Sequence, residues 1–372
     1  MRRLPRALAT LALLAVCAGA LAREDAPAPA PASPAHPPGG AAPASPVPGV
    51  PAEAPEPAGM GRADPKLVRL RFDWPAAAEV QATQRRTRTR TGHAPVTTTT
   101  RFTQRLERRE GALRISTSGT TWEGDAPYPG PPAAVEGVLR AAERVVQVVS
   151  PEGEFRGLEG VEALRPALAR VLAGSVPPEQ VERALGFAES SMQAQAQEMW
   201  NLAVGFWIGA DLELGERYGM RTEAEVPLAH AEAEFEQEFS VRRRVPCSAR
   251  DREERCVEVT LRSAPDPAAL PALARGVVAQ LAGGEAPVAA EALRELVVEN
   301  ELLLVTEPAR LLPHRVVWTR TVRATAAAGE GAGGEPRLLE QVDRHEADYR
   351  YDAPRKKPPR KPKRAQPRSA SR

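Results

Sequence analysis

Two cysteines are the residues whose type and spacing point most directly to chemistry. Cys247 and Cys256 lie nine positions apart, with a charged loop between them and predicted strands over residues 239–245 and 257–262. In an exported chain, an isolated pair of this kind is expected to form a disulfide across the loop. The redox motif CxxC does not occur, and no histidine lies close to either cysteine in sequence. We therefore expect no metal site there.

Other side chains that commonly perform catalysis do not fall into recognisable patterns. The five histidines are scattered along the chain, at His36, His93, His230, His314 and His345. No HExxH, GxSxG, SxxK or P-loop motif occurs, so we predict no catalytic residue, no metal and no cofactor. The expectation is a protein that is not an enzyme, with a hydrolase that lacks a recognisable motif as an alternative.

The longest helical pattern covers residues 178–209, and we expect the fold to be organised around it. Its apolar residues recur every three or four positions, which is typical of one buried helix face; they are Val181, Leu185, Ala188, Met192, Ala196, Met199, Ala203 and Phe206. Ser175 is the predicted N-cap. The aromatic residues at the end of the pattern, Trp200, Phe206 and Trp207, have two interpretations. They either pack in the core or line an apolar ligand cavity.

The N-terminal segment has the features of an export signal. Residues 1–22 combine a basic start, a short apolar stretch and small residues before a predicted cleavage site after Ala22. Lipidation of Cys17 is an alternative, because residues 14–17 resemble a lipobox, although Val16 departs from the usual small residue. Residues 23–64 are rich in alanine and proline and are predicted to be a disordered linker. We therefore expect a periplasmic or secreted protein with no transmembrane segment after cleavage.

A basic tail closes the sequence. Residues 353–372 hold nine Lys or Arg and no acidic residue, a composition that predicts disorder. The tail is a candidate contact with an anionic envelope surface, through Lys356, Lys357, Arg360, Lys361, Lys363 and Arg364. A solubilising tail is the alternative. Nucleic acid would also bind such a tail in vitro, but the export signal argues against nucleic acid as a physiological partner.

Alternation of apolar and polar residues between positions 65 and 352 predicts a series of antiparallel strands. We expect strands at residues 66–74, 79–91, 96–108, 112–122, 145–149, 231–239, 239–245, 257–262, 296–306, 315–325 and 338–351, and short helices at 131–146, 161–172 and 267–281. One strand face carries Arg86, Arg88 and Arg90, and another carries Glu232, Glu234, Glu236 and Glu238. These stripes either pair across neighbouring strands or form two unrelated solvated faces.

Two short passages resemble known exported proteins. The passage with Trp200, Val204, Trp207, Gly209, Leu212, Gly215 and Tyr218 is similar to one in uncharacterised exported proteins of Gram-negative bacteria. The passage with Glu307, Pro308 and residues 311–315 resembles a strand-turn-strand of periplasmic lipoprotein-carrier proteins. That resemblance implies a curved antiparallel sheet that covers helices and can hold acyl chains. Together the two passages cover about a tenth of the chain.

These patterns combine into one prediction of architecture and one of function. We expect a single α+β domain over residues 65–352, with a long antiparallel, half-barrel-like sheet packed on a central helix and shorter helices. We expect an exported envelope protein that binds an apolar or amphipathic ligand, or an envelope partner. A structural or scaffolding envelope protein is the alternative.

Overall fold

The computed structural model describes residues 66–124, 132–172, 177–226, 231–270, 293–326 and 337–351. The predicted signal peptide, the linker, Cys17, Ser175 and the basic tail lie outside the described residues. So does most of the helix predicted at 267–281, of which the structure describes the short 3₁₀ turn η3 (Pro267–Ala269).

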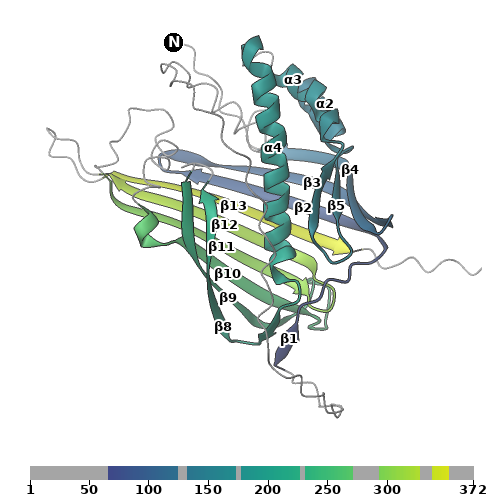
Figure 1. Ribbon diagram of the computed structural model, residues 1–372, viewed down its shortest axis with the longest axis vertical. Helices are drawn as coiled ribbons and strands as arrows, with labels where there is room; N and C mark the ends of the chain where they lie inside the picture. The colour runs from purple at the N-terminus through teal and green to yellow at the C-terminus, as the bar shows by residue number, and fades with distance from the viewer. Residues whose placement is uncertain are drawn as a thin grey trace, which may run out of the picture.

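Most of the described chain belongs to one open antiparallel sheet (Figure 1). The sheet has 11 strands in the order β6-β5-β4-β3-β2-β13-β12-β11-β10-β9-β8. Its strands are β2 (Ala77–Arg90), β3 (His93–Arg109), β4 (Ala112–Gly124), β5 (Val146–Val149), β6 (Phe155–Glu159), β8 (Arg217–Val226), β9 (Ala231–Val245), β10 (Cys256–Pro265), β11 (Leu293–Glu307), β12 (Leu312–Ala326) and β13 (Arg337–Tyr351). The predicted α+β fold with a long antiparallel sheet is confirmed.

The alternation within each strand separates the two faces of the sheet. On β13, Leu339, Asp343 and Ala347 are buried, while Arg344 and Asp348 are exposed. Successive side chains of a strand point to opposite faces, so the odd-numbered residues of β13 face the protein interior. β13 pairs with β2 on one side and with β12 on the other. The first and last long strands of the described part of the chain therefore meet at the centre of the sheet.

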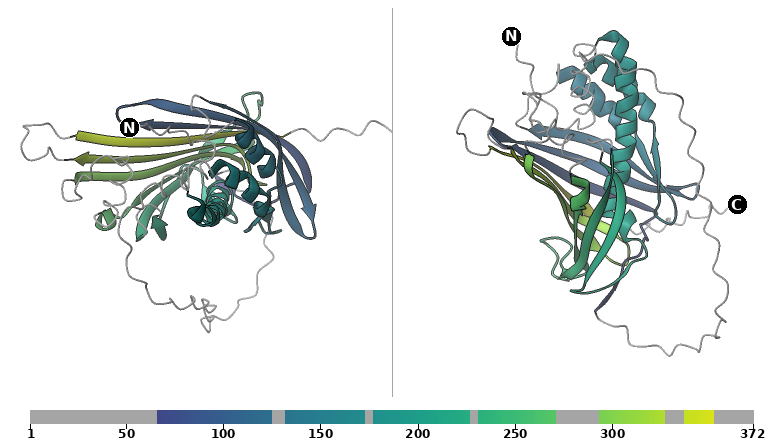
Figure 2. Two further views of the ribbon diagram at one scale, coloured as in Figure 1. Left: turned by 90° about the horizontal axis from the view of Figure 1, so that it is seen from above. Right: turned by 60° about the vertical axis from the view of Figure 1, so that its left-hand side comes forward.

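The helices lie on one face of the sheet, which we call the inner face. Figure 2 shows the sheet curving around them. The helices are α2 (Pro132–Ala142), α3 (Arg165–Leu172) and α4 (Pro178–Ala203), with a 3₁₀ turn, η1 (Val161–Leu164), before α3. The first half of α4 packs on α2 and α3 through Leu185, Ala188 and Met192. These three residues belong to the predicted apolar face of the helix.

The end of α4 enters the core against the sheet. The helix is followed by a 3₁₀ turn, η2 (Gly205–Trp207), and Trp200, Val204 and Trp207 pack with Val80 of β2 and other strand residues. The predicted central helix is therefore confirmed over Pro178–Ala203, although it ends before the predicted position 209 and its N-cap is Pro177 instead of Ser175. Within the described part of the chain, no helix combines the length and apolar character needed to cross a bilayer.

The strand predicted at 66–74 is shorter than its alternation suggested. Only β1 (Leu67–Arg69) is a strand, and it pairs with β7 (Asp211–Glu213) in a small separate sheet. The chain beyond β1 is held by contacts with loops, since the amide of Leu70 donates to Ala210 at 2.8 Å and the indole of Trp74 donates to Leu311 at 3.0 Å. The alternation still predicts which side chains are buried, because Val68, Leu70 and Trp74 all lie in the core.

The proposed pairing of the arginine and glutamate stripes is wrong. β2, which carries the arginines, is separated from β9, which carries the glutamates, by β13, β12, β11 and β10. The glutamates of β9 instead meet arginines of the neighbouring edge strand β8, where Arg221 lies 2.9 Å from Glu236 and 3.4 Å from Glu234. Sequence alternation assigns a face to each stripe, but it does not say which strands are neighbours.

Candidate ligand-binding face of the sheet

A group of charged and polar side chains lies on the inner face, where β2, β13 and β12 run side by side. The register places Arg90 beside Gln341, Arg88 beside Asp343 and Arg86 beside His345. On the other side of β13, Arg320 lies beside Asp343 and Trp318 beside His345. We call this set, made of Arg86, Arg88, Arg90, Arg320, Gln341, Asp343 and His345, the inner polar cluster.

Asp343 is the centre of the cluster. Its carboxylate accepts a hydrogen bond from Arg88 Nε at 2.6 Å and one from the Gln341 amide at 2.6 Å. Arg86 Nη2 lies 3.5 Å from the same carboxylate, and Arg90 Nε donates to Gln341 Oε1 at 2.7 Å. Asp343 is buried. The network therefore supplies the hydrogen-bond partners that a buried carboxylate requires.

The ionisation of the cluster follows from burial and from these contacts. Burial alone would raise the pKa of Asp343, but the charges and hydrogen bonds of Arg88 and Arg86 outweigh it and hold that pKa below its ordinary value. Burial and repulsion by Arg88 lower the pKa of Arg86. Burial and the arginines also lower the pKa of His345 to about 4, so its imidazole is neutral near pH 7. The cluster is therefore ionised at Asp343 and neutral at His345.

Helix α4 contributes a second carboxylate above the cluster. Glu198 is exposed to solvent, yet burial is the main cause that raises its pKa, and the charge of Arg320 opposes the rise. Burial likewise lowers the pKa of Arg320, against the attraction of Glu198 and Asp343. Glu198 on α4 and Arg320 on β12 therefore lie close enough for their charges to interact.

An aromatic region adjoins the cluster on the same face. The ring of Trp318 lies 5.1 Å from that of His345, measured between centroids. Further along β13, Tyr349 and Tyr351 pack against the apolar core but remain partly accessible, and burial raises the pKa of both phenols. The inner face thus passes from an apolar, aromatic region into a buried charged region within a few strand positions.

The three aromatic residues predicted to bind a ligand lie deeper in the protein. Trp207 is fully buried and Trp200 nearly so, and their indoles donate to the carbonyls of Leu202 and Gly153, both at 2.8 Å. Phe206 is half-buried, 4.7 Å from Trp207 between ring centroids. Trp200 packs separately, against Phe72 and Trp74. This burial indicates packing, and contact of these residues with a ligand stays a prediction.

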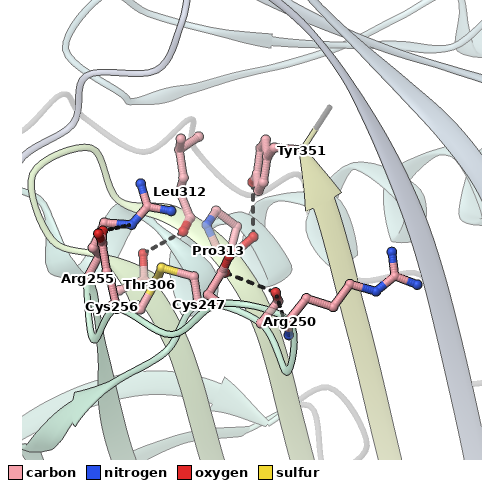
Figure 3. The surroundings of a disulfide bond; sticks show 11 residues. Cys247, Arg250, Arg255, Cys256, Thr306, Leu312, Pro313 and Tyr351 are labelled. Carbon is pink, nitrogen blue, oxygen red and sulfur yellow. Dashed lines mark hydrogen bonds and ion pairs between the residues drawn. A yellow bond between two sulfur atoms is a disulfide. The ribbon is translucent and has the colours of Figure 1, made fainter. Parts of the chain in front are cut away.

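The predicted disulfide between Cys247 and Cys256 is present, with their Cα atoms 5.0 Å apart (Figure 3). It links the end of β9 to the start of β10, as the flanking strand patterns predicted. The structure adds a residue that the sequence analysis did not connect with the cysteines. One imidazole nitrogen of His314 lies within 4.8 Å of both sulfurs. These three side chains are a group of potential metal ligands.

The inner polar cluster was also not foreseen as a site. The alternating arginines of β2 are visible in the sequence, but Asp343, which pairs with Arg88, lies 255 positions away from it. Asp343 is one of several acidic residues on β13, and nothing in the sequence of that strand predicts its contact with Arg88. The one signal in the sequence is that Asp343, a charged residue, occupies a position of β13 where alternation predicts an inward-facing side chain.

Comparisons with known proteins do not assign a family. No protein-family model and no curated protein matches the sequence. Among solved structures, the chain is similar to one described as lipid–protein interactions in lipovitellin, with 8% identity and a TM-score of 0.38, over 74% of this chain. The match spans 25% of that longer chain. The beta domain of the Bordetella autotransporter Brka matches at 12% identity and a TM-score of 0.16, over 74% of this chain and 99% of that one. Both TM-scores lie below 0.5, so neither match establishes a shared fold.

Proposed function

We propose that the protein is not an enzyme and binds an amphipathic, anionic ligand on the inner face of the sheet. The apolar part of the ligand would lie along the partly accessible aromatic residues Trp318, Tyr349 and Tyr351, and its anionic group would lie at the inner polar cluster. The disulfide supports an oxidising location outside the cytoplasm. A periplasmic or secreted site of action is part of the proposal.

The observation that supports the proposal most strongly is the gathering of arginines around Asp343 in the inner polar cluster. The carboxylate of Asp343 lies 2.6 Å from Arg88 and 3.5 Å from Arg86, and its charge also acts on Arg320. Three guanidinium groups therefore gather around one buried carboxylate, and burial raises the pKa of Glu198, the carboxyl of α4 that interacts with Arg320. Charges in a low-dielectric site interact strongly, so a positive site of this kind attracts an anion. The adjoining aromatic residues would favour an anion that carries an apolar chain.

Binding of a fluorescent fatty acid to the purified full chain tests this proposal. A polyene fatty acid is titrated into the protein, and then displaced with a long-chain carboxylate or with the alcohol of the same chain length. We expect the carboxylate to displace the probe at lower concentration than the alcohol. The substitution Arg320→Gln should weaken carboxylate binding about tenfold or more, because a hydrogen bond to a charged group contributes about 1.5–3 kcal/mol.

The matched control is Arg85→Gln. Arg85 is exposed and lies on β2 beside Arg86, on the opposite face of the sheet. The substitution Arg85→Gln should leave the concentration of carboxylate that displaces the probe unchanged. Equal affinity of the wild-type protein for the carboxylate and the alcohol would refute an anion site on the inner face. An equal loss of carboxylate affinity in Arg85→Gln and Arg320→Gln would refute it as well. Near-ultraviolet circular dichroism checks that both variants keep the native packing.

A further inference from the structure

A second site, separate from the inner polar cluster, lies at the disulfide. Cys247 follows β9, Cys256 begins β10, and both are buried. His314 comes from β12, 58 positions after Cys256, and its ring nitrogen and the two sulfurs all lie within 4.8 Å of one another. The fold therefore brings together two sulfurs and one imidazole that the sequence separates widely.

The backbone that carries His314 is fixed from both neighbouring strands. The hydroxyl of Thr306 on β11 donates to the carbonyl of Leu312 at 3.0 Å, and the hydroxyl of Tyr351 on β13 donates to the carbonyl of Pro313 at 3.0 Å (Figure 3). The ring of Tyr351 also packs 5.0 Å from that of His314. The imidazole is consequently held beside the sulfurs before any ligand arrives, which favours binding by reducing the ordering cost.

The electrostatic surroundings suit a cation. In its neutral form, the imidazole of His314 has a ring nitrogen whose lone pair can bind a metal ion. Two carboxylates, of Glu307 and Asp251, act on the imidazole with negative charge, and Arg255 opposes them. Two thiolates with one neutral imidazole form a ligand set that Zn²⁺ commonly takes in proteins.

We propose that reduction of the Cys247–Cys256 disulfide converts this group into a Zn²⁺ site with Cys247, Cys256 and His314 as protein ligands and a fourth position for water. An external dithiol supplies two electrons and two protons, and is itself oxidised to a disulfide. The two thiols then lose their protons to solvent as both sulfurs bind the ion. In the oxidised protein the sulfurs are bonded to each other, so metal binding and the disulfide exclude one another.

The required movement is small. Around a tetrahedral Zn²⁺ with usual bond lengths, the sulfurs lie about 3.8 Å apart and each lies about 3.6 Å from the imidazole nitrogen. Rotation about the Cα–Cβ bonds of the cysteines can separate the sulfurs, and the imidazole starts within 4.8 Å of both. The strands that carry the three residues can therefore keep their pairing.

Cobalt spectroscopy on the full chain tests the site. The protein is reduced with a phosphine under anaerobic conditions and titrated with Co²⁺, and then with Zn²⁺ as competitor. We expect thiolate-to-cobalt charge transfer and the intense visible bands of tetrahedral Co²⁺, at one ion per chain, only after reduction. His314→Asn should weaken binding by at least about tenfold, since even loss of a group that orients a ligand costs 10–100-fold. The control His93→Asn changes an exposed histidine at the β2–β3 turn and should leave the affinity for Co²⁺ unchanged.

Two results would overturn the proposal. One is a reduced protein that shows no thiolate-to-cobalt charge transfer. The other is an unchanged spectrum and affinity in His314→Asn, which would remove the imidazole from the site. If that variant does not fold, zinc-edge X-ray absorption on the reduced wild-type protein decides instead. Two sulfurs with one imidazole would support the site, and sulfur coordination without imidazole would exclude it.

Discussion

Replacement of Asp343 by asparagine should destabilise the protein at neutral pH. The side chain keeps its size and one oxygen that can accept a hydrogen bond, but its negative charge is lost. Arg88 at 2.6 Å and Arg86 at 3.5 Å then remain as two positive charges beside each other without the carboxylate that they share. Arg320 also loses an attracting charge. The variant therefore tests whether this carboxylate stabilises the charged inner face.

The size of the effect follows from burial. Removal of one partner from a fully buried ion pair costs about 3–5 kcal/mol. The side chains of Arg86 and Arg88 keep 16% and 28% of their exposure, so water can solvate them in part. We therefore expect a loss of about 2–3 kcal/mol for Asp343→Asn. The control Asp348→Asn changes an exposed carboxyl on the same strand and should stay within about 0.5 kcal/mol of wild type.

Urea unfolding of both variants, with the disulfide intact, measures this difference, and its pH dependence tests the cause. Because the folded pKa of Asp343 is lowered, its stabilisation is present above the unfolded pKa of about 3.9 and is lost as pH falls through the folded pKa. The gap between wild type and Asp343→Asn should therefore close below about pH 4. Equal unfolding midpoints at pH 7, or a gap that persists in acid, would refute the reasoning.

Three other outcomes follow from the structure. Trp207→Ala removes a fully buried ring and should cost about 3–5 kcal/mol in urea unfolding; a loss below 1 kcal/mol would show that its surroundings collapse around the gap. The double change of Cys247 and Cys256 to serine opens a loop between residues nine apart and should cost about 2.6 kcal/mol by loop entropy, measured against wild type under oxidising conditions. The imidazole of His345 should titrate in NMR at about 4. Since that folded pKa lies below the unfolded value of about 6.5, this histidine should reduce stability as pH falls between the two values, and a midpoint near 6.5 would contradict its burial beside the arginines.

Much of the secondary structure was predictable because the strands are long and alternate strictly. β11, β12 and β13 each exceed the predicted ranges by only a few residues, since half of every strand faces the core. The helix at 178–203 was equally clear from the spacing of Leu185, Ala188 and Met192. In both cases the spacing of the apolar residues along the chain indicates which side of the strand or helix is buried, and burial of that side stabilises the strand or helix.

Neighbours in space were not predictable, because alternation says nothing about strand order. One hypothesis paired the arginines of β2 with the glutamates of β9, while Arg86 and Arg88 form ion pairs with Asp343 on β13. The contact of His314 with Cys247 and Cys256 was missed for the same reason, since three strands from distant parts of the chain must assemble before it exists. Both candidate sites consist of such long-range contacts.

The inner polar cluster is hard to explain by stability alone. Neighbouring positions on the same face of the sheet hold apolar residues, such as Ala347, Val322 and Ala324, so the fold accepts apolar side chains there. Replacement of a buried ion-pair network by packed apolar residues is often neutral or stabilising. A sequence selected only to fold would therefore gain little from the arginines. Departures from local rules of this kind tend to mark functional positions, and an anion bound at Arg320 would offset the repulsion between the buried arginines. Such a ligand should then raise the unfolding midpoint of the wild-type protein more than that of Arg320→Gln.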